Sequence, residues 1–243
     1  AVAHAGRVGP DGGLLKEFLE AEGVDVSAIE TDPSTPSGHT VIQVSREAQN
    51  AILLFSGSNG AVDKAYADRV LAQFGTGDIL LLQNEISALP YILEKAHARG
   101  MEIWLNPSPM NENVLKCNLS LVSVFVLNEV EGEQLTGTKI PTAILDKLLQ
   151  KYPHAAAVLT LGSKGAWHAK EDKRAFAPAE LVRAVDTTAA GDTFTGYFMR
   201  GMLDGLSPKK SLTLAAKAAA IAVSRPGAAP SIPLYAEVTS ERN

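Results

Sequence analysis

Short apolar runs alternate with amphipathic stretches along most of the chain, and this alternation limits the fold more than any other feature of the sequence. The run 79–82 is wholly apolar, as in a strand that is buried on both faces of a parallel sheet. Strands are expected at 79–82, 103–105, 122–127, 157–161 and 182–185, and helices at 14–19, 63–74, 87–99, 129–135, 142–151, 191–206 and 208–224. The pattern predicts an α/β fold: a single domain over 1–243 with a doubly wound, mostly parallel sheet and helices on both faces.

Residues 37–56 break this alternation. Two strand-like runs, 40–44 and 52–55, flank the polar stretch 45–50, which predicts an antiparallel hairpin. Antiparallel strands inserted into a parallel α/β chain suggest a small side sheet that acts as a lid. Because exposed strand edges are often covered by pairing, a homodimer through this lid is expected.

Composition excludes several classes of protein. The net charge is −5 and the basic residues are scattered, whereas a nucleic-acid-binding protein needs a basic face. No run approaches the roughly 18 apolar residues of a membrane span. Cys117 is the single cysteine, which argues against a disulfide framework and fits a reducing compartment, and no signal pattern opens the chain. A cytoplasmic protein that binds neither nucleic acid nor membrane is therefore expected.

A turn of small residues, 187–190, separates the expected strand 182–185 from the expected helix 191–206. Such a turn leaves backbone N–H groups free at a helix N-terminus, where an anion binds well. Asp192 lies in the first turn of this helix, where its carboxylate can take a proton from an attacking hydroxyl while the amides hold a phosphoryl group. The alternative is an aspartate that only favours the helix dipole.

The turn belongs to a longer string, Asp186-Thr187-Thr188-Ala189-Ala190-Gly191-Asp192-Thr193-Phe194. This string resembles the C-terminal signature of the ribokinase-like carbohydrate kinases, the PfkB family, and the resemblance extends over nearly the whole chain. It implies a ribokinase-like fold, Asp192 as the catalytic base, and an anion hole formed by the amides of Ala189, Ala190 and Gly191. The usual family string has glycine where this chain has Ala189, and alanine loses freedom at positive φ.

Asn128 and Glu131 follow an expected strand and resemble the family's Asn-x-x-Glu motif. The resemblance implies that they organise Mg²⁺ and its waters near the ATP phosphates, and oxygen ligands suit magnesium. Without the resemblance, the same pair is interpreted as a helix cap.

The loop at 160–165 resembles the family's nucleotide-contacting loop, Thr-x-Gly-x-x-Gly. It is not a Walker A loop, because the chain has no Gly-x₄-Gly-Lys-Ser/Thr string. By resemblance, ATP binds along Asn128, this loop, Gly191 and Ala216, which stands where the family often has His or Asn near the adenine. The loop residues are Thr160, Leu161, Gly162, Ser163, Lys164 and Gly165.

Residues 222–231 resemble the family's C-terminal loop, which encloses a monovalent cation, usually K⁺, together with the start of the signature. Bound K⁺ would order the anion-hole turn. The alternative is an ordinary Pro/Gly loop after a helix. Carried over by position, the K⁺ ligands, largely backbone carbonyls, are Asp186, Thr188, Ala222, Arg225, Gly227 and Ser231.

Glu85 follows the expected strand 79–82 and aligns by resemblance with a glutamate that contacts the sugar. Residues 49–50 and 56–59 are also similar to the family. The family's first strand, with its sugar-binding aspartate, and its Gly-Gly-Lys-Gly-Asn run have no counterpart here. The native protein is therefore expected to begin about 50–60 residues earlier, judged from typical domain anatomy.

The activity that the resemblance implies is transfer of the γ-phosphoryl group of ATP to a sugar hydroxyl, with D-ribose phosphorylated at its 5-hydroxyl. Fructose, deoxyribose and a nucleoside remain open as acceptors. Two other classes also remain open: a non-catalytic sugar- or nucleotide-binding protein on the same fold, and a dinucleotide-dependent oxidoreductase. Asp192 disfavours the first, since binding alone gains nothing from a base, and the lack of Gly-x-Gly-x-x-Gly after an early strand disfavours the second.

Overall fold

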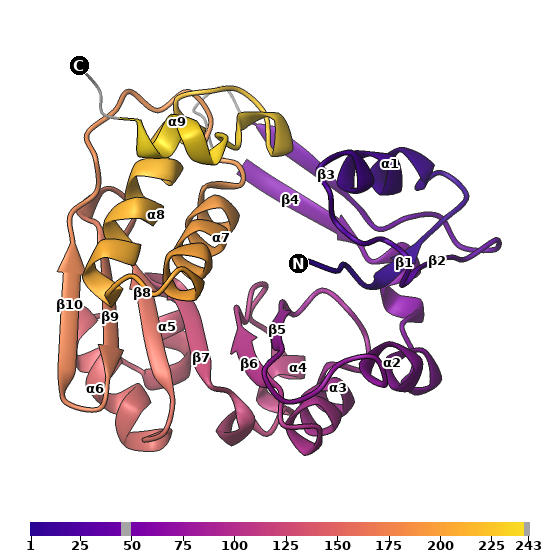
Figure 1. The fold of residues 1–243 in the computed structure, drawn as a ribbon, viewed down its shortest axis with the longest axis horizontal. Helices are drawn as coiled ribbons and strands as arrows, with labels where there is room; N and C mark the ends of the chain where they lie inside the picture. The colour runs from indigo at the N-terminus through magenta and orange to yellow at the C-terminus, as the bar shows by residue number, and fades with distance from the viewer. Residues whose placement is uncertain (45–49, 241–243) are drawn as a thin grey trace. The chain divides into compact units, whose positions relative to one another are not determined.

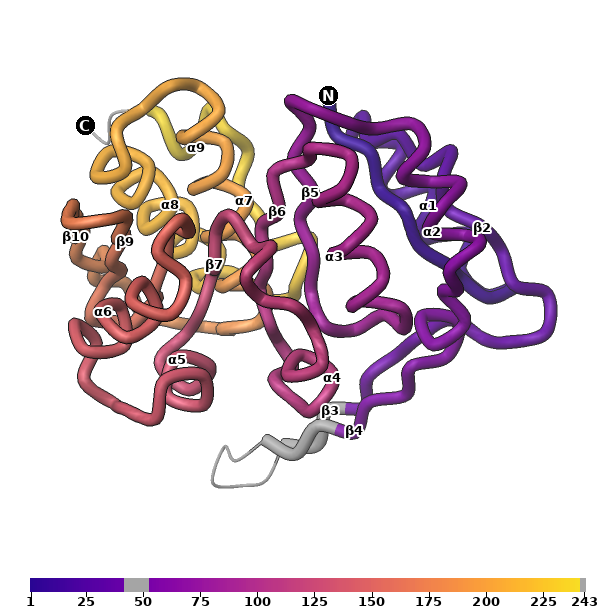
Figure 2. The backbone as a smooth tube through the Cα atoms, turned by 90° about the horizontal axis from the view of Figure 1, so that it is seen from below, coloured from indigo at the N-terminus to yellow at the C-terminus, as the bar shows by residue number. Residues whose placement is uncertain are grey.

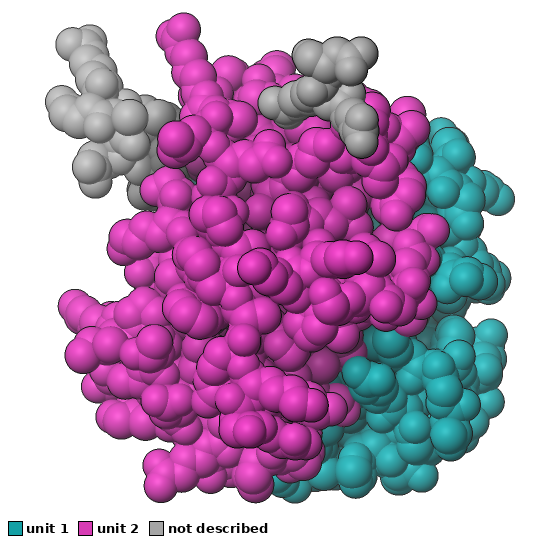
Figure 3. Space-filling view, turned by 60° about the vertical axis from the view of Figure 1, so that its left-hand side comes forward, with its two compact units in different colours: residues 1–103, 108–121 teal, residues 104–107, 122–243 magenta. Residues whose placement is uncertain are grey.

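The structure is a computed structural model that describes residues 1–44 and 50–240 (Figure 1). Residues 45–49, which contain most of the predicted hairpin connection and Gln49, lie outside the described residues. The chain divides into two compact units, residues 1–103 with 108–121 and residues 104–107 with 122–243 (Figure 3). Within the described ranges, no helix is both long enough and apolar enough to cross a membrane.

The main sheet is mixed and has the strand order β10-β9-β8-β7-β6-β5. Strand β7 pairs in parallel with β6 and with β8, whereas β9 pairs antiparallel with both β8 and β10. The mostly parallel sheet that the alternation predicts is thus confirmed for its central strands. The strands are β5 (Ile79–Leu82), β6 (Glu102–Leu105), β7 (Val124–Asn128), β8 (Ala156–Thr160), β9 (Ala166–Lys170) and β10 (Lys173–Ala177).

The register between β7 and β8 places Asn128 directly opposite Thr160. Each is the last residue of its strand, and the four residues before each are fully buried. Apolar side chains on both faces fix these strands inside the sheet, so that the polar residues emerge together at its carboxyl edge. Ligands of open α/β sheets bind at this edge.

The prediction of a strand at 182–185 was wrong. These residues have no regular structure, and the amides of Val185 and Asp186 donate to the carbonyl of Val223 at 2.7 and 3.2 Å. The sheet instead ends on β10, which forms a tight hairpin with β9. The alternation did not reveal β10, because its first two residues are Lys173 and Arg174 and only its second half is apolar.

Helices cover both faces of this sheet. Figure 2 shows α5 and α6 on one side of β7 to β10, and α7 and α8 on the other. Three of the starts have a sequence signal: Asn128 and Ser207 cap α5 and α8 through their side chains, and Pro141 and Pro208 open α6 and α8. The helices are α5 (Glu129–Thr136), α6 (Pro141–Lys151), α7 (Ala190–Leu203), α8 (Pro208–Val223) and α9 (Tyr235–Thr239).

Helix α7 is anchored in the core by Phe198, which is 1% exposed. Its ring lies 6.0 Å from the ring of Trp104 in β6 and 5.9 Å from that of His168 in β9. On its other side, α7 approaches α8 closely at Gly201, where an added Cβ would lie 2.8 Å from the hydroxyl oxygen of Ser211. The position of α7 relative to the sheet is thus set by a large aromatic residue and a glycine.

The first unit contains two small sheets besides its share of the main one. Strands β1 (Gly6–Val8) and β2 (Ile29–Thr31) pair in parallel, and β3 (His39–Val44) and β4 (Asn50–Phe55) form the predicted antiparallel hairpin. Strand β5 is the last in the sheet order, and Leu81 is 44% exposed, so the prediction that this run is buried on both faces was wrong. The helices are α1 (Gly13–Ala21), α2 (Lys64–Leu71), α3 (Leu89–Ala98) and α4 (Glu112–Leu115).

Two glycines of α7 give a matched test of this packing. Gly201→Ala should lower the free energy of unfolding by about 1–3 kcal/mol, because its methyl group collides with Ser211. Gly196→Ala on the same helix has open space around its Cβ and should raise stability by about 0.5–1 kcal/mol. Urea denaturation of both variants measures the difference. Equal effects at the two positions would contradict the close approach of α7 to α8.

Candidate active site

The signature turn leads directly into α7. Ala189 precedes the helix with φ 59° and ψ 10°, in the left-handed region that glycine adopts most readily. The amide of Thr193 donates to the carbonyl of Ala189 at 2.9 Å, which closes the first helical turn around Asp192. The residue before the helix provides no side-chain cap, and the amide of Ala190 donates to the carbonyl of Thr187 at 3.3 Å. A helix N-terminus without a side-chain cap is a place where an anion can bind.

Asp192 lies in this first turn and is exposed to solvent, as a base that meets a substrate must be. Thr193 and Phe194 beside it are buried and attach the turn to the core. The hydroxyl of Thr195 donates to the carbonyl of Gly191 at 2.8 Å. The sequence prediction of Asp192 at the start of a helix is therefore confirmed, and its neighbours hold the turn rigidly.

Asp186 joins the signature to the loop that follows α8. Its carboxylate accepts one hydrogen bond from the amide of Thr188 at 2.9 Å and another from the amide of Gly227 at 3.0 Å. The bonds from Thr188, and then the one from Gly227, lower the pKa of this carboxyl group. Two segments that lie 41 residues apart, both predicted to contact K⁺, are thus brought together at one carboxylate.

The loop itself presents oxygen atoms. Ser231 is fully buried, and its hydroxyl donates to the carbonyl of Ala228 at 2.7 Å. The carbonyl of Ala222 accepts from the amide of Arg225 at 3.0 Å, at the carboxyl end of α8, where the helix dipole favours positive charge. The carboxylate of Asp186, the hydroxyl of Ser231 and the carbonyl of Ala222 are hard oxygen atoms, each hydrogen-bonded within the protein. Hard oxygen atoms are the donors that suit a monovalent cation.

Asn128 and Glu131 form a reciprocal capping box at the start of α5. The amide of Glu131 donates to Asn128 Oδ1 at 2.9 Å, and the backbone amide and Nδ2 of Asn128 donate to the Glu131 carboxylate at 3.0 and 2.9 Å. Glu131 is 5% exposed. The interpretation as a helix cap is therefore confirmed, and the magnesium role stays a prediction.

The predicted nucleotide loop forms a single 3₁₀ turn, Gly162–Lys164, between β8 and β9. Position 165 requires glycine, because its backbone has φ 113° and an added Cβ would lie 2.2 Å from the carbonyl oxygen of Ala177. The Leu161 side chain is buried, so this residue can offer a ligand only its backbone, and Ala216 is buried in α8. Thr160, Ser163 and Lys164 keep accessible side chains.

Glu129 is a neighbour of the predicted nucleotide loop that the sequence analysis did not name. Its carboxylate lies 3.3 Å from the ammonium group of Lys164, which links the start of α5 to the loop after β8. The signal that could have found it is the register of the two strands, since each residue follows closely on one of the paired positions Asn128 and Thr160. Without the structure, that register is not visible.

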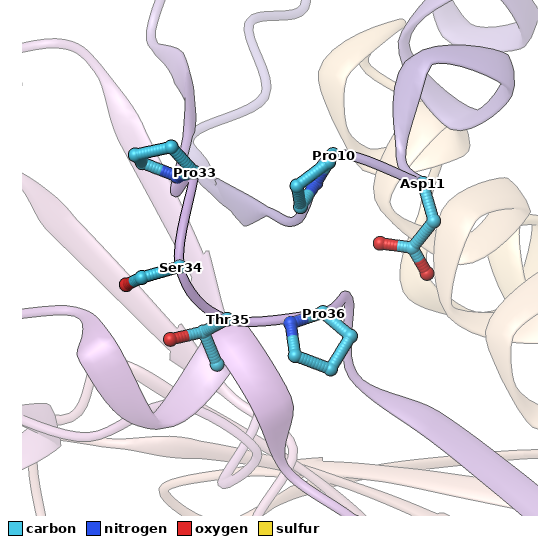
Figure 4. Close-up of a pocket in the computed structure, with 6 residues that line it drawn as sticks. All are labelled: Pro10, Asp11, Pro33, Ser34, Thr35 and Pro36. Atoms are coloured by element: carbon cyan, nitrogen blue, oxygen red, sulfur yellow. The ribbon is translucent and has the colours of Figure 1, made fainter.

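Glu85 belongs to the other unit, in the turn after β5, and is exposed. Its neighbour Asn84 is buried and ties this turn to the Ser108–Pro109 segment, since its backbone amide donates to the carbonyl of Ser108 and its side chain to that of Pro109. A pocket of about 340 Å³ in this unit contains none of the predicted residues (Figure 4). It is lined by Pro10, Asp11, Pro33, Ser34, Thr35 and Pro36.

The described part of the chain contains neither a cluster of metal-binding side chains nor a reactive thiol. No three His, Cys, Asp or Glu side chains gather there in a way that could hold a metal ion. Burial raises the pKa of the Cys117 thiol to about 11, which makes it a poor nucleophile. Burial also lowers the pKa of His168 to about 4, so this histidine is a neutral core residue.

Comparison with known proteins identifies the family of this chain. The model for the pfkB family of carbohydrate kinases matches residues 1–234. Ribokinase of Schizosaccharomyces pombe is 35% identical over an alignment of 257 positions, which covers 100% of this chain and 80% of the yeast protein. The crystal structure of ribokinase from Cryptococcus neoformans with ADP is 28% identical and has a TM-score of 0.85, over 98% of this chain and 81% of that one.

A ribokinase structure from Arabidopsis thaliana, complexed with ribose and ATP, is also 28% identical, with a TM-score of 0.82 over 97% of this chain and 80% of that one. The chain belongs to the pfkB family of carbohydrate kinases. Its fold is the ribokinase fold that the signature implied.

The left-handed backbone at Ala189 gives a test of the signature turn. Ala189→Gly removes about 1–2 kcal/mol of backbone strain but adds freedom to the unfolded chain, so its unfolding free energy should match or slightly exceed that of the wild type. Ala190→Gly lies within the helix and should lose up to about 1 kcal/mol. Thermal unfolding compares the two variants. A clear loss of stability at position 189 would contradict the positive φ.

Proposed function

We propose that the protein transfers the γ-phosphoryl group of ATP to D-ribose and forms ribose 5-phosphate. The observation that carries this proposal is Asp192, exposed in the first turn of a helix whose leading amides lack a side-chain cap. The family and the relatives named ribokinase support the reaction class and the acceptor. The structure from Arabidopsis, complexed with ribose and ATP, supports both substrates.

Asp192 takes the proton from the 5-hydroxyl of ribose as this oxygen attacks the γ-phosphorus. The amides of Ala189, Ala190 and Gly191 stabilise the charge that develops on the transferring group. Of these amides, that of Ala190 donates to the carbonyl of Thr187 at 3.3 Å in the structure, and it would exchange this long hydrogen bond for one to the phosphate. Glu85 contacts the sugar and helps to hold it for in-line attack.

The nucleotide lies along the carboxyl edge of β7 and β8. Asn128 and the loop 160–165 are adjacent there because of the strand register. Lys164 offers a positive charge to the phosphates, and backbone groups around Gly162 and Gly165 allow close approach. Ala216 in α8 lies near the base, where it contributes shape and no hydrogen bond.

Two cations complete the proposed site. Asn128 and Glu131 would hold the water shell of Mg²⁺, since amide and carboxylate oxygen atoms accept hydrogen bonds from metal-bound water. Bound Mg²⁺ neutralises charge on the phosphates. K⁺ would be held by the oxygen atoms around Asp186 and the loop 222–231, and it would brace the turn that precedes α7.

Acceptor-dependent release of ADP tests the proposed function. Ribose should stimulate ADP release more than fructose, deoxyribose or a nucleoside. Asp192→Asn should reduce turnover by about 10²–10⁴-fold, because a general base contributes that much. Asp204→Asn, at the other end of α7, should leave turnover unchanged. A panel in which no acceptor stimulates ADP release would favour a binding protein, and another preferred acceptor would overturn ribose.

We also propose that the hairpin β3–β4 acts as a lid and pairs with a second copy. Val41, Leu53, Leu54 and Phe55 are 47–60% exposed, so the hairpin presents an apolar surface that a partner can cover. Leu53→Lys should shift the mass measured by light scattering from dimer toward monomer. Leu115→Lys, at another exposed leucine, should not. A wild-type monomer at all concentrations would refute the dimer.

A further inference from the structure

Glu237 in α9 holds the side chain of Arg225. Its Oε1 accepts from Arg225 Nη2 at 2.5 Å, and its Oε2 accepts from the amide of Leu234 at 2.7 Å. Both interactions lower the pKa of the Glu237 carboxyl, the one with Arg225 most. The carboxylate is therefore charged at neutral pH and is aimed by the backbone at the start of its own helix.

Helix α9 is itself fixed in place. Val238 is 1% exposed and packs with Ala218 and Ile221 of α8. The hydroxyl of Tyr197 in α7 donates to the carbonyl of Pro233 at 2.6 Å. These contacts fix the position of Glu237, so its carboxylate determines where the guanidinium of Arg225 lies.

The side chain of Arg225 is long enough to reach the carboxylate of Asp186. It lies two residues before Gly227, whose amide binds the Asp186 carboxylate at 3.0 Å. Two residues span at most about 7 Å, a distance that an arginine side chain can cross. In the structure, however, Asp186 is bound by the amides of Thr188 and Gly227, and the guanidinium points to Glu237.

A guanidinium on Asp186 would exclude a second positive charge from the same oxygen atoms. It is also permanently charged and prefers to bind carboxylates through two parallel hydrogen bonds. We propose that Glu237 is a positioning residue that keeps Arg225 away from Asp186, so that a monovalent cation can use this carboxylate together with the loop carbonyls. The proposal rests on the K⁺ site of the proposed function.

Glu237→Gln tests it, because the substitution keeps the shape of the side chain and removes the charge that attracts Arg225. The half-saturating K⁺ concentration should rise by about threefold to tenfold. It is measured in two ways: as the KCl-dependent rise in melting temperature of the ligand-free protein, with choline chloride as the salt control, and as the KCl dependence of ribose-stimulated ADP release. Turnover at saturating K⁺ should stay within about twofold of the wild type, since the chemical groups are intact.

A second substitution separates positioning from simple bracing. Adding Arg225→Gln to Glu237→Gln removes the competing charge and should return the half-saturating K⁺ concentration to within about threefold of the wild type. If the ion pair only braced the loop, the double variant would be as defective as Glu237→Gln, and the proposal would fail. Asp146→Asn removes an ion pair with Arg174 elsewhere in the unit and should not change the K⁺ response.

The same samples distinguish this proposal from the proposed function. A wild type that releases ADP with ribose but shows no K⁺ effect in either measurement overturns the role of Glu237 and leaves the kinase reaction intact. A wild type whose melting temperature responds to K⁺ but which releases no ADP with any acceptor overturns the reaction and leaves the cation site intact. An unchanged K⁺ response in Glu237→Gln overturns the positioning role.

Discussion

The carboxylate of Asp186 is the point on which the candidate site depends. Its hydrogen bonds to Thr188 and Gly227 connect the turn before α7 with the chain that leaves α8. Because α7 and α8 are also packed closely at Gly201, both ends of the signature turn are held by distant parts of the sequence. The strained backbone of Ala189 and the placement of Asp192 are therefore consequences of tertiary structure, and the local sequence alone would not maintain them.

Much of the fold could be predicted because the pattern of apolar residues indicates which side chains are buried. Runs such as those in β7 and β8 have few alternatives to a buried strand, and the helices between them have caps or prolines at their starts. Two of the failures have a common cause. The run 182–185 and the run of β5 look like strands of the interior, but their surroundings depend on which segments lie beside them. Strand β10 was missed for the opposite reason, since a short hairpin can form from a half-polar sequence.

The candidate site divides in the same way. Asp192, Asp186 and Gly165 could be named from the sequence because each stands in a string that resembles a family motif, although the bond from Gly227 to Asp186 became visible only in the structure. Glu129 and Glu237 could not, because each acts on a partner set by strand register or helix docking. The pair Asn128 and Glu131 has two interpretations, as a helix cap and as a magnesium site. Its capping box is visible in the structure, whereas its role toward Mg²⁺ is a prediction from resemblance.

The register of β7 against β8 also limits how relatives of this chain can vary in length. One extra residue inside either strand would move Asn128 past Thr160 by about 3.3 Å and turn the following side chains to the opposite face. The α5 cap and the loop after β8 would then no longer meet. Insertions in the connections 137–140 and 152–155 leave the register untouched. Natural variation in chain length should therefore collect in those connections.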